Sequence, residues 1–198
     1  MIIVTGPSRS GKSEWAEMLA MQTGKKVIYV ATAKIDINDL EWQERIAKHQ
    51  KRRPSEWLTV SVPEDIVTTI QEAETDSCLL IDSLGTWVAN WIDRDEETWE
   101  NIVLSLLNTV QEIDKKELIF VAEETGWGVV PAYPVGRLFR DRLGSLVRYL
   151  GAIANTVYLV TGGHVINLTM LGSPLPLPAK FTIVENRQQT RSNREEQM

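Results

Sequence analysis

A glycine-rich segment near the start of the chain holds the residue types best suited to chemistry. Gly6-Pro7-Ser8-Arg9-Ser10-Gly11-Lys12-Ser13 matches G-x-x-x-x-G-K-[ST] at every fixed position. In such a loop the glycines let backbone N–H groups wrap around phosphate oxygens, and the following helix points its N-terminus at the same anion. We expect Lys12 to reach the β- and γ-phosphates and the hydroxyl of Ser13 to bind Mg²⁺. The segment therefore predicts a site for a nucleotide and its metal.

Besides the hydroxyl of Ser13, the metal at a phosphate-binding loop needs an acidic residue, usually at the end of another buried strand. Asp82 meets this need, because it directly follows the apolar run Cys78-Leu79-Leu80-Ile81. The alternative is a solvated aspartate that caps the next helix. Residues 82–85 also spell D-x-x-G, a motif of signalling GTPases. No asparagine of the chain is followed by lysine, so the base-reading motif N-K-x-D of that class is missing. We interpret D-x-x-G as chance spacing.

A histidine, His49, lies inside a run of cations. Residues 45–53 carry five formal positive charges, on Arg45, Lys48, Lys51, Arg52 and Arg53. Cationic neighbours disfavour the imidazolium form, so His49 is biased toward the neutral form, which is a competent nucleophile. Clustered cations can also hold a triphosphate. These residues leave three interpretations open: a nucleophile, a solvated helix face, and a patch for nucleic acid.

Composition limits the wider possibilities. With 198 residues the chain should form one domain, or one domain with an appendage. A net charge of −6 argues against nucleic acid or a membrane surface as the partner of the whole protein. One cysteine excludes an intrachain disulfide and fits a reducing compartment, so we expect a cytoplasmic protein. No apolar run approaches the roughly 20 residues of a membrane span, and no targeting segment is apparent.

Apolar runs of strand length alternate with segments of helix length. The expected strands are Ile2–Thr5, Lys26–Val30, Trp57–Val62, Cys78–Asp82, Leu118–Ala122 and Thr156–Thr161. The expected helices are Lys12–Gln22, Asp39–Lys51, Pro63–Glu72, Glu96–Asp114 and Val135–Ala154, with one more that carries Trp87 and Trp91. Most of the apolar runs are continuous, as in a sheet covered on both faces. The alternation predicts an α/β fold with a mostly parallel sheet flanked by helices, and the loop makes it P-loop NTPase-type.

The end of the chain has a different character. Residues 1–171 are the expected nucleotide-binding domain, and residues 172–198 are the expected linker and flexible tail. Gly172–Pro178 is rich in proline, and Phe181–Val184 could form a short edge strand. Asn186–Met198 is polar and lacks apolar periodicity, so we expect it to be disordered.

A few other residues also have types and positions that bear on function. Trp127 lies between two glycines and is a candidate for stacking on a large planar ligand. Glu123 and Glu124 end a strand, where one of them could help to bind Mg²⁺ or a substrate hydroxyl. For His164, after Gly162 and Gly163, a turn histidine is favoured over a metal ligand.

The order of these motifs resembles one family, the bifunctional adenosylcobinamide kinase/adenosylcobinamide-phosphate guanylyltransferases of cobalamin biosynthesis. The matching stretches are Ile3–Ser13 (IVTGPSRSGKS), Tyr29–Thr32 (YVAT), Arg45–Trp57 (RIAKHQKRRPSEW), Leu79–Asn90 (LLIDSLGTWVAN), Gly126–Pro131 (GWGVVP) and Arg137–Gly144 (RLFRDRLG). The phosphate-binding loop is generic. In contrast, R-I-x-x-H followed by R-P-x-x-W is specific, and so is G-W-G-x-V-P.

The resemblance implies a homotrimeric enzyme with two activities. One phosphorylates the aminopropanol hydroxyl of adenosylcobinamide, with ATP or GTP as the donor. The other transfers GMP from GTP to that phosphate through a guanylylated histidine, which falls on His49. The resemblance also places nucleotide contacts at Thr32 and at the residues after the histidine, Gln50, Lys51, Arg52 and Arg53, and it places the strand-end acid on Asp82. The implied partners are GTP, ATP, Mg²⁺ and a corrinoid, without nucleic acid.

Departures from the family pattern are concentrated downstream. The family usually has N-E-V-G where this chain has Glu123-Glu124-Thr125-Gly126, and V-P-E-N-R-L-A-R where it has Val130–Arg137. An expected N-Q pair is replaced by Val147-Arg148, and an expected acid by Ser61. These changes spare the phosphate-binding residues and bear on the contacts to the corrinoid, guanine and ribose. Three alternatives stay open: a P-loop kinase of another metabolite with an inert His49, a nonenzymatic nucleotide-gated assembly module, and a nucleic-acid binder that uses residues 45–53. The net charge of −6 counts against the third.

Overall fold

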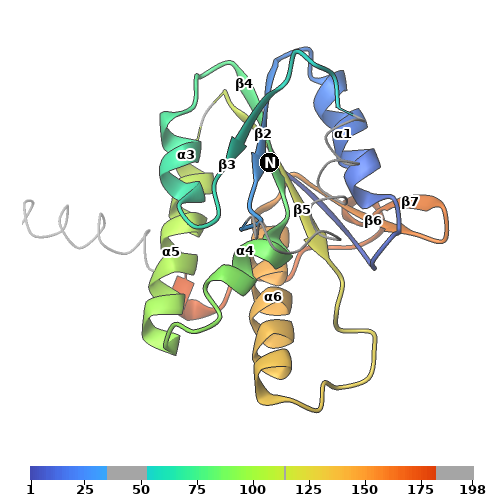
Figure 1. Ribbon diagram of the computed structural model, residues 1–198. Coiled ribbons are helices and arrows are strands. Elements are labelled where there is room, and N and C mark those ends of the chain that lie inside the picture. The colour runs from blue at the N-terminus through green and yellow to red at the C-terminus, as the bar shows by residue number, and fades with distance from the viewer. Residues whose placement is uncertain (35–52, 114, 182–198) are drawn as a thin grey trace, which may run out of the picture.

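The computed structural model describes residues 1–34, 53–113 and 115–181 (Figure 1). In chain order its elements are β1 (Ile2–Gly6), α1 (Lys12–Gln22), β2 (Lys26–Ala31), β3 (Leu58–Ser61), α3 (Ile66–Glu72), β4 (Ser77–Asp82), α4 (Leu84–Asn90), α5 (Glu96–Glu112), β5 (Glu117–Glu123), α6 (Pro134–Ile153), β6 (Thr156–Thr161), β7 (His164–Asn167), α7 (Leu168–Leu171) and a 3₁₀ turn, η1 (Ala179–Phe181). The expected helix Asp39–Lys51 lies outside the described residues.

The described strands form one sheet in the order β3-β2-β4-β5-β1-β6-β7. All neighbouring strands pair in parallel except β6 and β7, which pair antiparallel. The predicted α/β fold with a mostly parallel sheet is therefore confirmed. Strand β5 lies between β1, which leads into the glycine-rich loop, and β4, which ends at Asp82.

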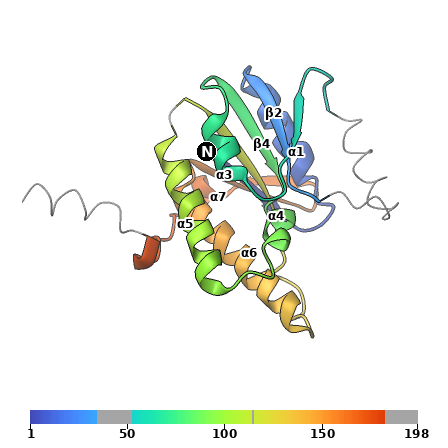
Figure 2. The same ribbon diagram turned by 60° about the vertical axis from the view of Figure 1, so that its left-hand side comes forward.

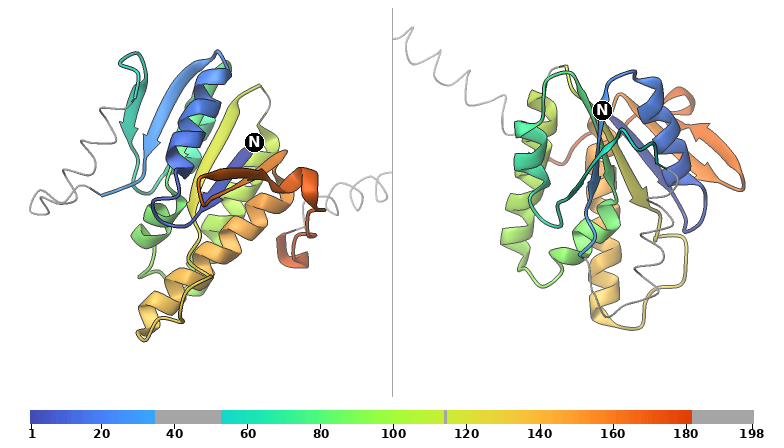
Figure 3. Two further views of the ribbon diagram at one scale, coloured as in Figure 1. Left: turned by 90° about the vertical axis from the view of Figure 1, so that its right-hand side faces the viewer. Right: turned by 45° about the horizontal axis from the view of Figure 1, so that its top comes forward.

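Helices cover both faces of this sheet, as the continuous apolar strands predict. Among the described helices, α1 lies on one face, and α3, α4, α5 and α6 lie on the other (Figures 2 and 3). The side chains of β4 show the division, because they point to opposite faces in turn. Leu80 packs in the core under α1, whereas Leu79 and Ile81 pack in the larger core with Trp87 and Phe120. We find no helix in the described ranges that is long and apolar enough to cross a membrane.

A side-chain cap sets the start of α3, and another sets the start of α5. Helix α3 begins at Ile66, because the carboxylate of Asp65 accepts a hydrogen bond from the backbone N–H of Thr68 at 3.0 Å. The prediction that Pro63 opens this helix was therefore wrong. Asp95 caps α5 in the same way through Thr98, at 2.8 Å.

The end of the described chain differs from the prediction in two places. Strand β7 was not predicted, and it forms a hairpin with β6 through Gly162 and Gly163, which both have positive φ, as a tight two-residue hairpin turn requires. Phe181 was predicted to start an edge strand, but it lies in η1. Its buried ring packs on Tyr149, with the ring centroids 4.8 Å apart. Burial against another aromatic ring stabilises a phenylalanine side chain more than a solvent-exposed sheet edge would.

Cys78 is a buried core residue, as predicted, and this has a measurable consequence. Burial is the largest cause that raises the pKa of its thiol, to about 11. Since the thiolate is the reactive form, native protein at pH 8 should react with Ellman's reagent at least about 100-fold more slowly than unfolded protein. Unfolding in guanidinium should release one reactive thiol per chain. Rapid reaction of the native protein would contradict the buried position.

Candidate nucleotide site

The glycine-rich loop joins β1 to α1 at the carboxyl edge of the sheet. Gly11 is the N-cap of α1, with φ of +93°, and Arg9 has φ of +60°. Left-handed residues of this kind turn successive N–H groups toward a common point, which suits an anion. Within this loop Pro7 is half-buried and Ser8 is exposed. The whole predicted segment from Gly6 to Ser13 is thus brought together as one loop and helix start.

Close packing at Gly6 shapes the start of this loop. A Cβ atom on Gly6 would lie 2.3 Å from the backbone oxygen of Val160 and 2.8 Å from Oγ of Ser10. The Ser10 hydroxyl is buried, and no described group forms a hydrogen bond with it. A buried hydroxyl without a hydrogen-bond partner, next to a glycine of the loop, is consistent with a loop whose polar groups bind phosphate oxygens.

Replacing Gly6 with alanine should disrupt both the fold and the loop. The oxygen of Val160 belongs to β6, so the added methyl group must push two paired strands apart. We expect the free energy of unfolding to fall by about 2 kcal/mol, and nucleotide binding to weaken at least tenfold. Urea denaturation and calorimetric titration would measure the two effects. Gly144→Ala is the control, because nothing crowds that exposed helical position and alanine should stabilise it by up to about 1 kcal/mol.

Lys12 occupies an unusual position for a lysine. It is 8% exposed, and its ammonium group donates to the carbonyl of Pro7 at 3.3 Å. Among the described residues, no carboxylate forms an ion pair with it. A buried charge without a counter-ion is costly. The position is therefore suited to a lysine that meets its anion only when a phosphate group is bound.

Asp82 ends β4 on the face of the sheet that α1 covers. The side chain two residues earlier, Leu80, packs in the core under α1, and alternation along a strand puts Asp82 on the same side. Its Oδ2 atom accepts a hydrogen bond from the hydroxyl of Tyr29 at 2.9 Å. Burial, and then the negative charge of Asp82, raise the pKa of Tyr29 far above its ordinary value, so this hydroxyl stays protonated and donates.

The oxygen atoms of Ser13 and Asp82 fit Mg²⁺. Helix α1 packs against β1, β4 and β5, so its first turn lies at the edge where β4 ends. A hydroxyl and a carboxylate are ligands that Mg²⁺ prefers, and this ion usually completes its shell with water and substrate phosphates. In the described ranges no three acids, histidines or cysteines cluster to make an all-protein metal site. The donor set therefore suits a metal that arrives with a nucleotide.

The alternative that Asp82 caps the next helix is wrong. Ser83 is the N-cap of α4, and it forms a capping box with Thr86. The buried hydroxyl of Thr32 also binds Ser83: it donates to the carbonyl at 2.7 Å and accepts from the N–H at 2.9 Å. The amide of Asn90 donates to the carbonyls of Thr32 and Pro63. These bonds fix the turn after Asp82, and the nucleotide contact expected of Thr32 stays a prediction.

Glu123 links the end of β5 to the same turn. Its carboxylate accepts from the hydroxyl of Ser83 at 2.6 Å and from the N–H of Gly85 at 2.9 Å. The next N–H along the chain, that of Glu124, donates to the carbonyl of Gly6 at 2.9 Å. The end of β5 therefore connects the phosphate-binding loop with the segment that carries Asp82. A role of Glu123 or Glu124 toward Mg²⁺ or a substrate hydroxyl stays a prediction.

Arg53 is the one residue of the predicted segment 49–53 that the structure describes. The carbon atom of its guanidinium group lies 3.5 Å from the ring centroid of Tyr29, the partner of Asp82. The other predicted residues, His49, Gln50, Lys51 and Arg52, lie outside the described residues. Trp127 is 63% exposed in the loop that follows β5, so its ring is open to a ligand.

Sequence reasoning missed Tyr29 and Asn90 as individual parts of the site. Both fall within stretches that carried the family resemblance, but neither has a spacing that predicts a role. A phenol at the end of an apolar strand was the available signal for Tyr29. The signal for Asn90 was its position as an amide at the end of a mostly apolar helix. A polar group in such a place needs a hydrogen-bond partner if it is buried.

Comparison with known proteins gives this site a context. The family model described as cobinamide kinase / cobinamide phosphate guanyltransferase matches residues 2–168. The bifunctional adenosylcobalamin biosynthesis protein CobP of Pseudomonas aeruginosa is 37% identical over 177 residues, which cover 88% of this chain and 95% of that protein. The bifunctional adenosylcobalamin biosynthesis protein CobU of Escherichia coli is 33% identical over 178 residues, covering 82% and 96%.

A solved structure from Pyrococcus horikoshii OT3 is similar in fold. It covers 84% of both chains with a TM-score of 0.54 and 6% sequence identity. Such low identity speaks for the arrangement of strands and helices only. The relatives CobP and CobU, in contrast, match this chain in sequence over most of its length. The stretch that the family model matches includes the loop at residues 6–13 and Asp82. The chain therefore belongs to the cobinamide kinase / cobinamide phosphate guanyltransferase family.

Proposed function

We propose that this protein phosphorylates the aminopropanol hydroxyl of adenosylcobinamide, with ATP or GTP, and then transfers GMP from GTP to the new phosphate through a guanylylated His49. The observation that carries the proposal is the buried Lys12, which has no carboxylate partner among the described residues and sits in a loop built for phosphate. The names of the relatives agree with it, since they are bifunctional proteins of adenosylcobalamin biosynthesis.

In the kinase step, the hydroxyl oxygen of the acceptor attacks the γ-phosphorus of the nucleotide. The bond from that phosphorus to the bridging oxygen breaks, the nucleoside diphosphate leaves, and the hydroxyl proton passes to the medium. Lys12 and the N–H groups of the loop stabilise the negative charge that develops on the phosphate oxygens. Mg²⁺, when bound by Ser13 and Asp82 with the nucleotide, supplies further charge neutralisation.

In the transferase step, a neutral ring nitrogen of His49 attacks the α-phosphorus of GTP. The bond to the α,β-bridging oxygen breaks, pyrophosphate leaves, and the imidazole loses its N–H proton. A phosphate oxygen of adenosylcobinamide phosphate then attacks the same phosphorus. The P–N bond breaks, and the leaving imidazole takes a proton back from the medium, which restores the neutral histidine. Dividing one displacement into two in this way is the usual benefit of a covalent intermediate.

Three further statements belong to the proposal. The acceptor is a corrinoid, the active form is a homotrimer, and the enzyme works in the cytoplasm. The structure gives one feature that suits a large planar acceptor, the exposed Trp127 in the loop that begins beside the phosphate site. The departures from the family pattern downstream bear on how tightly that acceptor is held.

The test is the intact mass of the protein after incubation with Mg²⁺ and GTP without an acceptor. We expect the mass of one GMP to be added, through a bond that acid breaks. His49→Ala should show no adduct. His164→Ala is a matched control, because it removes the other histidine of the chain, an exposed one at the β6–β7 turn, and should keep the adduct.

An absent adduct on the wild type, with nucleotide binding intact, would reject the covalent mechanism. A P-loop kinase of another metabolite would then be the better explanation if γ-phosphate still passes to a small molecule. Nucleotide-dependent assembly without any phosphorylated product would support the nonenzymatic alternative.

A further inference from the structure

We infer that Tyr29 is a positioning residue for Asp82: its hydroxyl fixes one carboxylate oxygen so that the other is presented to the metal of a bound nucleotide. The inference rests on the proposed nucleotide site, but not on the guanylyl transfer. Tyr29 itself touches neither nucleotide nor metal in this assignment, since it acts through the carboxylate.

The contact between the two residues follows from the register of the sheet. Strands β2 and β4 pair in parallel, with Tyr29 opposite Leu80 and Ala31 opposite Asp82. Residues two apart on a strand point to the same face, so the tyrosine and the aspartate share the face that α1 covers. The ring spans this diagonal, and its hydroxyl donates to Oδ2 of Asp82 at 2.9 Å.

The tyrosine is held firmly enough to orient its partner. It is 4% exposed and belongs to the core under α1. The guanidinium group of Arg53 covers one face of its ring, at 3.5 Å from the centroid. A ring fixed by packing on one side and by a cation on the other cannot easily carry its hydroxyl elsewhere.

The bond to Tyr29 leaves half of the carboxylate available. Among the described residues, Oδ1 of Asp82 has no hydrogen-bond partner, whereas Oδ2 has the phenol. A metal-binding carboxylate commonly has this arrangement, in which one oxygen is oriented by a neighbour and the other faces the ion. A second tyrosine of the sheet, Tyr158, provides the contrast: it packs edge-on against Trp15 at 5.6 Å and donates to no carboxylate of the described residues.

The test compares nucleotide binding with and without Mg²⁺, so that no turnover is needed. The probe is a fluorescent methylanthraniloyl GDP, titrated in EDTA and then against increasing Mg²⁺. Tyr29→Phe keeps the ring and its stack on Arg53 but removes the hydroxyl. We expect its affinity in EDTA to stay within twofold of the wild type, while half-maximal Mg²⁺ enhancement needs about 10-fold more metal. Tyr158→Phe, the matched control, should behave as the wild type does in both titrations.

A double-mutant cycle with Asp82→Asn separates positioning from general support of the fold. If the tyrosine acts through the aspartate, Tyr29→Phe should change nothing further in the Asp82→Asn background. The inference is overturned if Tyr29→Phe keeps the wild-type Mg²⁺ requirement, if it weakens binding in EDTA equally, or if its effect persists without the carboxylate. Failure of the proposed guanylyl transfer would be seen as a missing adduct and would leave these titrations readable.

Discussion

Lys12→Met is expected to lower the rates of both proposed activities at least about 100-fold without destabilising the nucleotide-free protein. The loss in rate follows from the removal of the cation that neutralises charge on the transferring phosphate, and single groups of this kind are typically worth 10²–10³-fold. Both activities should fall together, because the proposed mechanism uses the same phosphate-binding loop for both. Initial rates of phosphate transfer and of adduct formation would measure the two effects.

The stability of the same variant is the more discriminating measurement. In the wild type the ammonium group is nearly buried, donates to the Pro7 carbonyl, and has no carboxylate partner among the described residues. Methionine matches its length but needs no counter-ion, so the midpoint of thermal unfolding should stay the same or rise. Added nucleotide, which should stabilise the wild type by mass action, should stabilise Lys12→Met much less.

Lys25→Met is the matched control. Lys25 lies just before β2, at the edge of the sheet opposite the phosphate-binding loop, and pairs with Asp76 and Glu117 at 3.7 and 3.8 Å. Its loss should change stability by at most about 1 kcal/mol and leave both rates intact. Full activity in Lys12→Met, or a marked loss of stability in the nucleotide-free protein, would contradict the role given to Lys12.

The parts of the fold that could be predicted are those with strong local signals. The buried strands are continuous apolar runs, and each lies within one or two residues of its predicted bounds because turn residues flank it. The phosphate-binding loop was predictable for the same reason, since the glycines and Lys12 lie within eight residues of one another. Hairpin strand β7 had no such signal: it is four residues long, and most of its side chains are exposed or half-buried.

The contacts that build the site depend on the order of strands, which local patterns do not reveal. Tyr29 meets Asp82 because β2 lies beside β4, although 53 residues separate them in the chain. Glu123 reaches the start of α4 because β5 lies on the other side of β4. The sequence predicts that each strand ends in a polar side chain. It does not predict the hydrogen-bond partners of that side chain, since the same series of strands and helices along the chain can form sheets with several strand orders.

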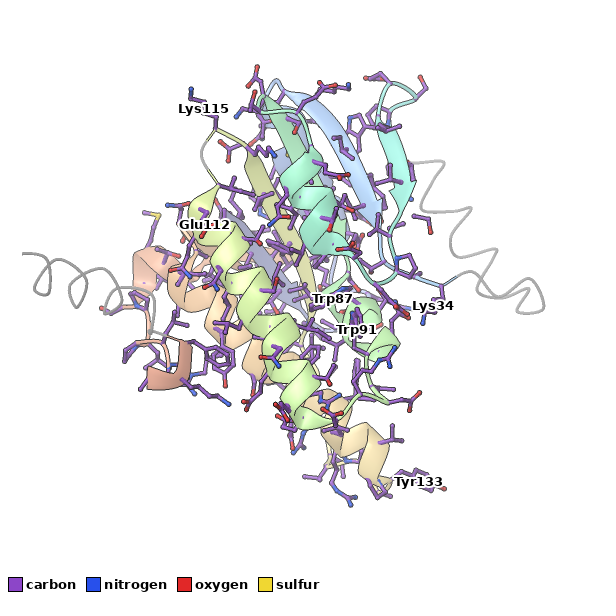
Figure 4. All side chains as sticks on the ribbon, turned by 90° about the vertical axis from the view of Figure 1, so that its left-hand side faces the viewer. Lys34, Trp87, Trp91, Glu112, Lys115 and Tyr133 are labelled. Carbon is purple, nitrogen blue, oxygen red and sulfur yellow. The ribbon has the colours of Figure 1, made fainter. Side chains whose placement is uncertain are left out.

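In the core behind this site, Trp87→Ala is expected to lower the free energy of unfolding by about 3–5 kcal/mol. Trp87 lies on α4 (Figure 4) and is fully buried. Its ring centroid is 5.8 Å from that of Trp99, and its indole N–H donates to the carbonyl of Glu64 at 2.7 Å. Truncation leaves a cavity between α4 and α5 that rigid neighbours cannot close. Since whole domains are stable by only about 5–15 kcal/mol, the variant should unfold at a clearly lower urea concentration.

Trp127→Ala is the control for this loss, because the same side chain is removed from an exposed position. It should change the free energy of unfolding by less than about 0.5 kcal/mol. A loss below about 1.5 kcal/mol in Trp87→Ala would mean that α4 is anchored elsewhere. The distinction matters for the site, because α4 begins at the turn after Asp82 and ends at Asn90, which holds the carbonyl of Thr32. Trp87 fixes the middle of that helix, so its removal should also weaken binding of the Mg²⁺-nucleotide, even though it lies in the core and touches no ligand.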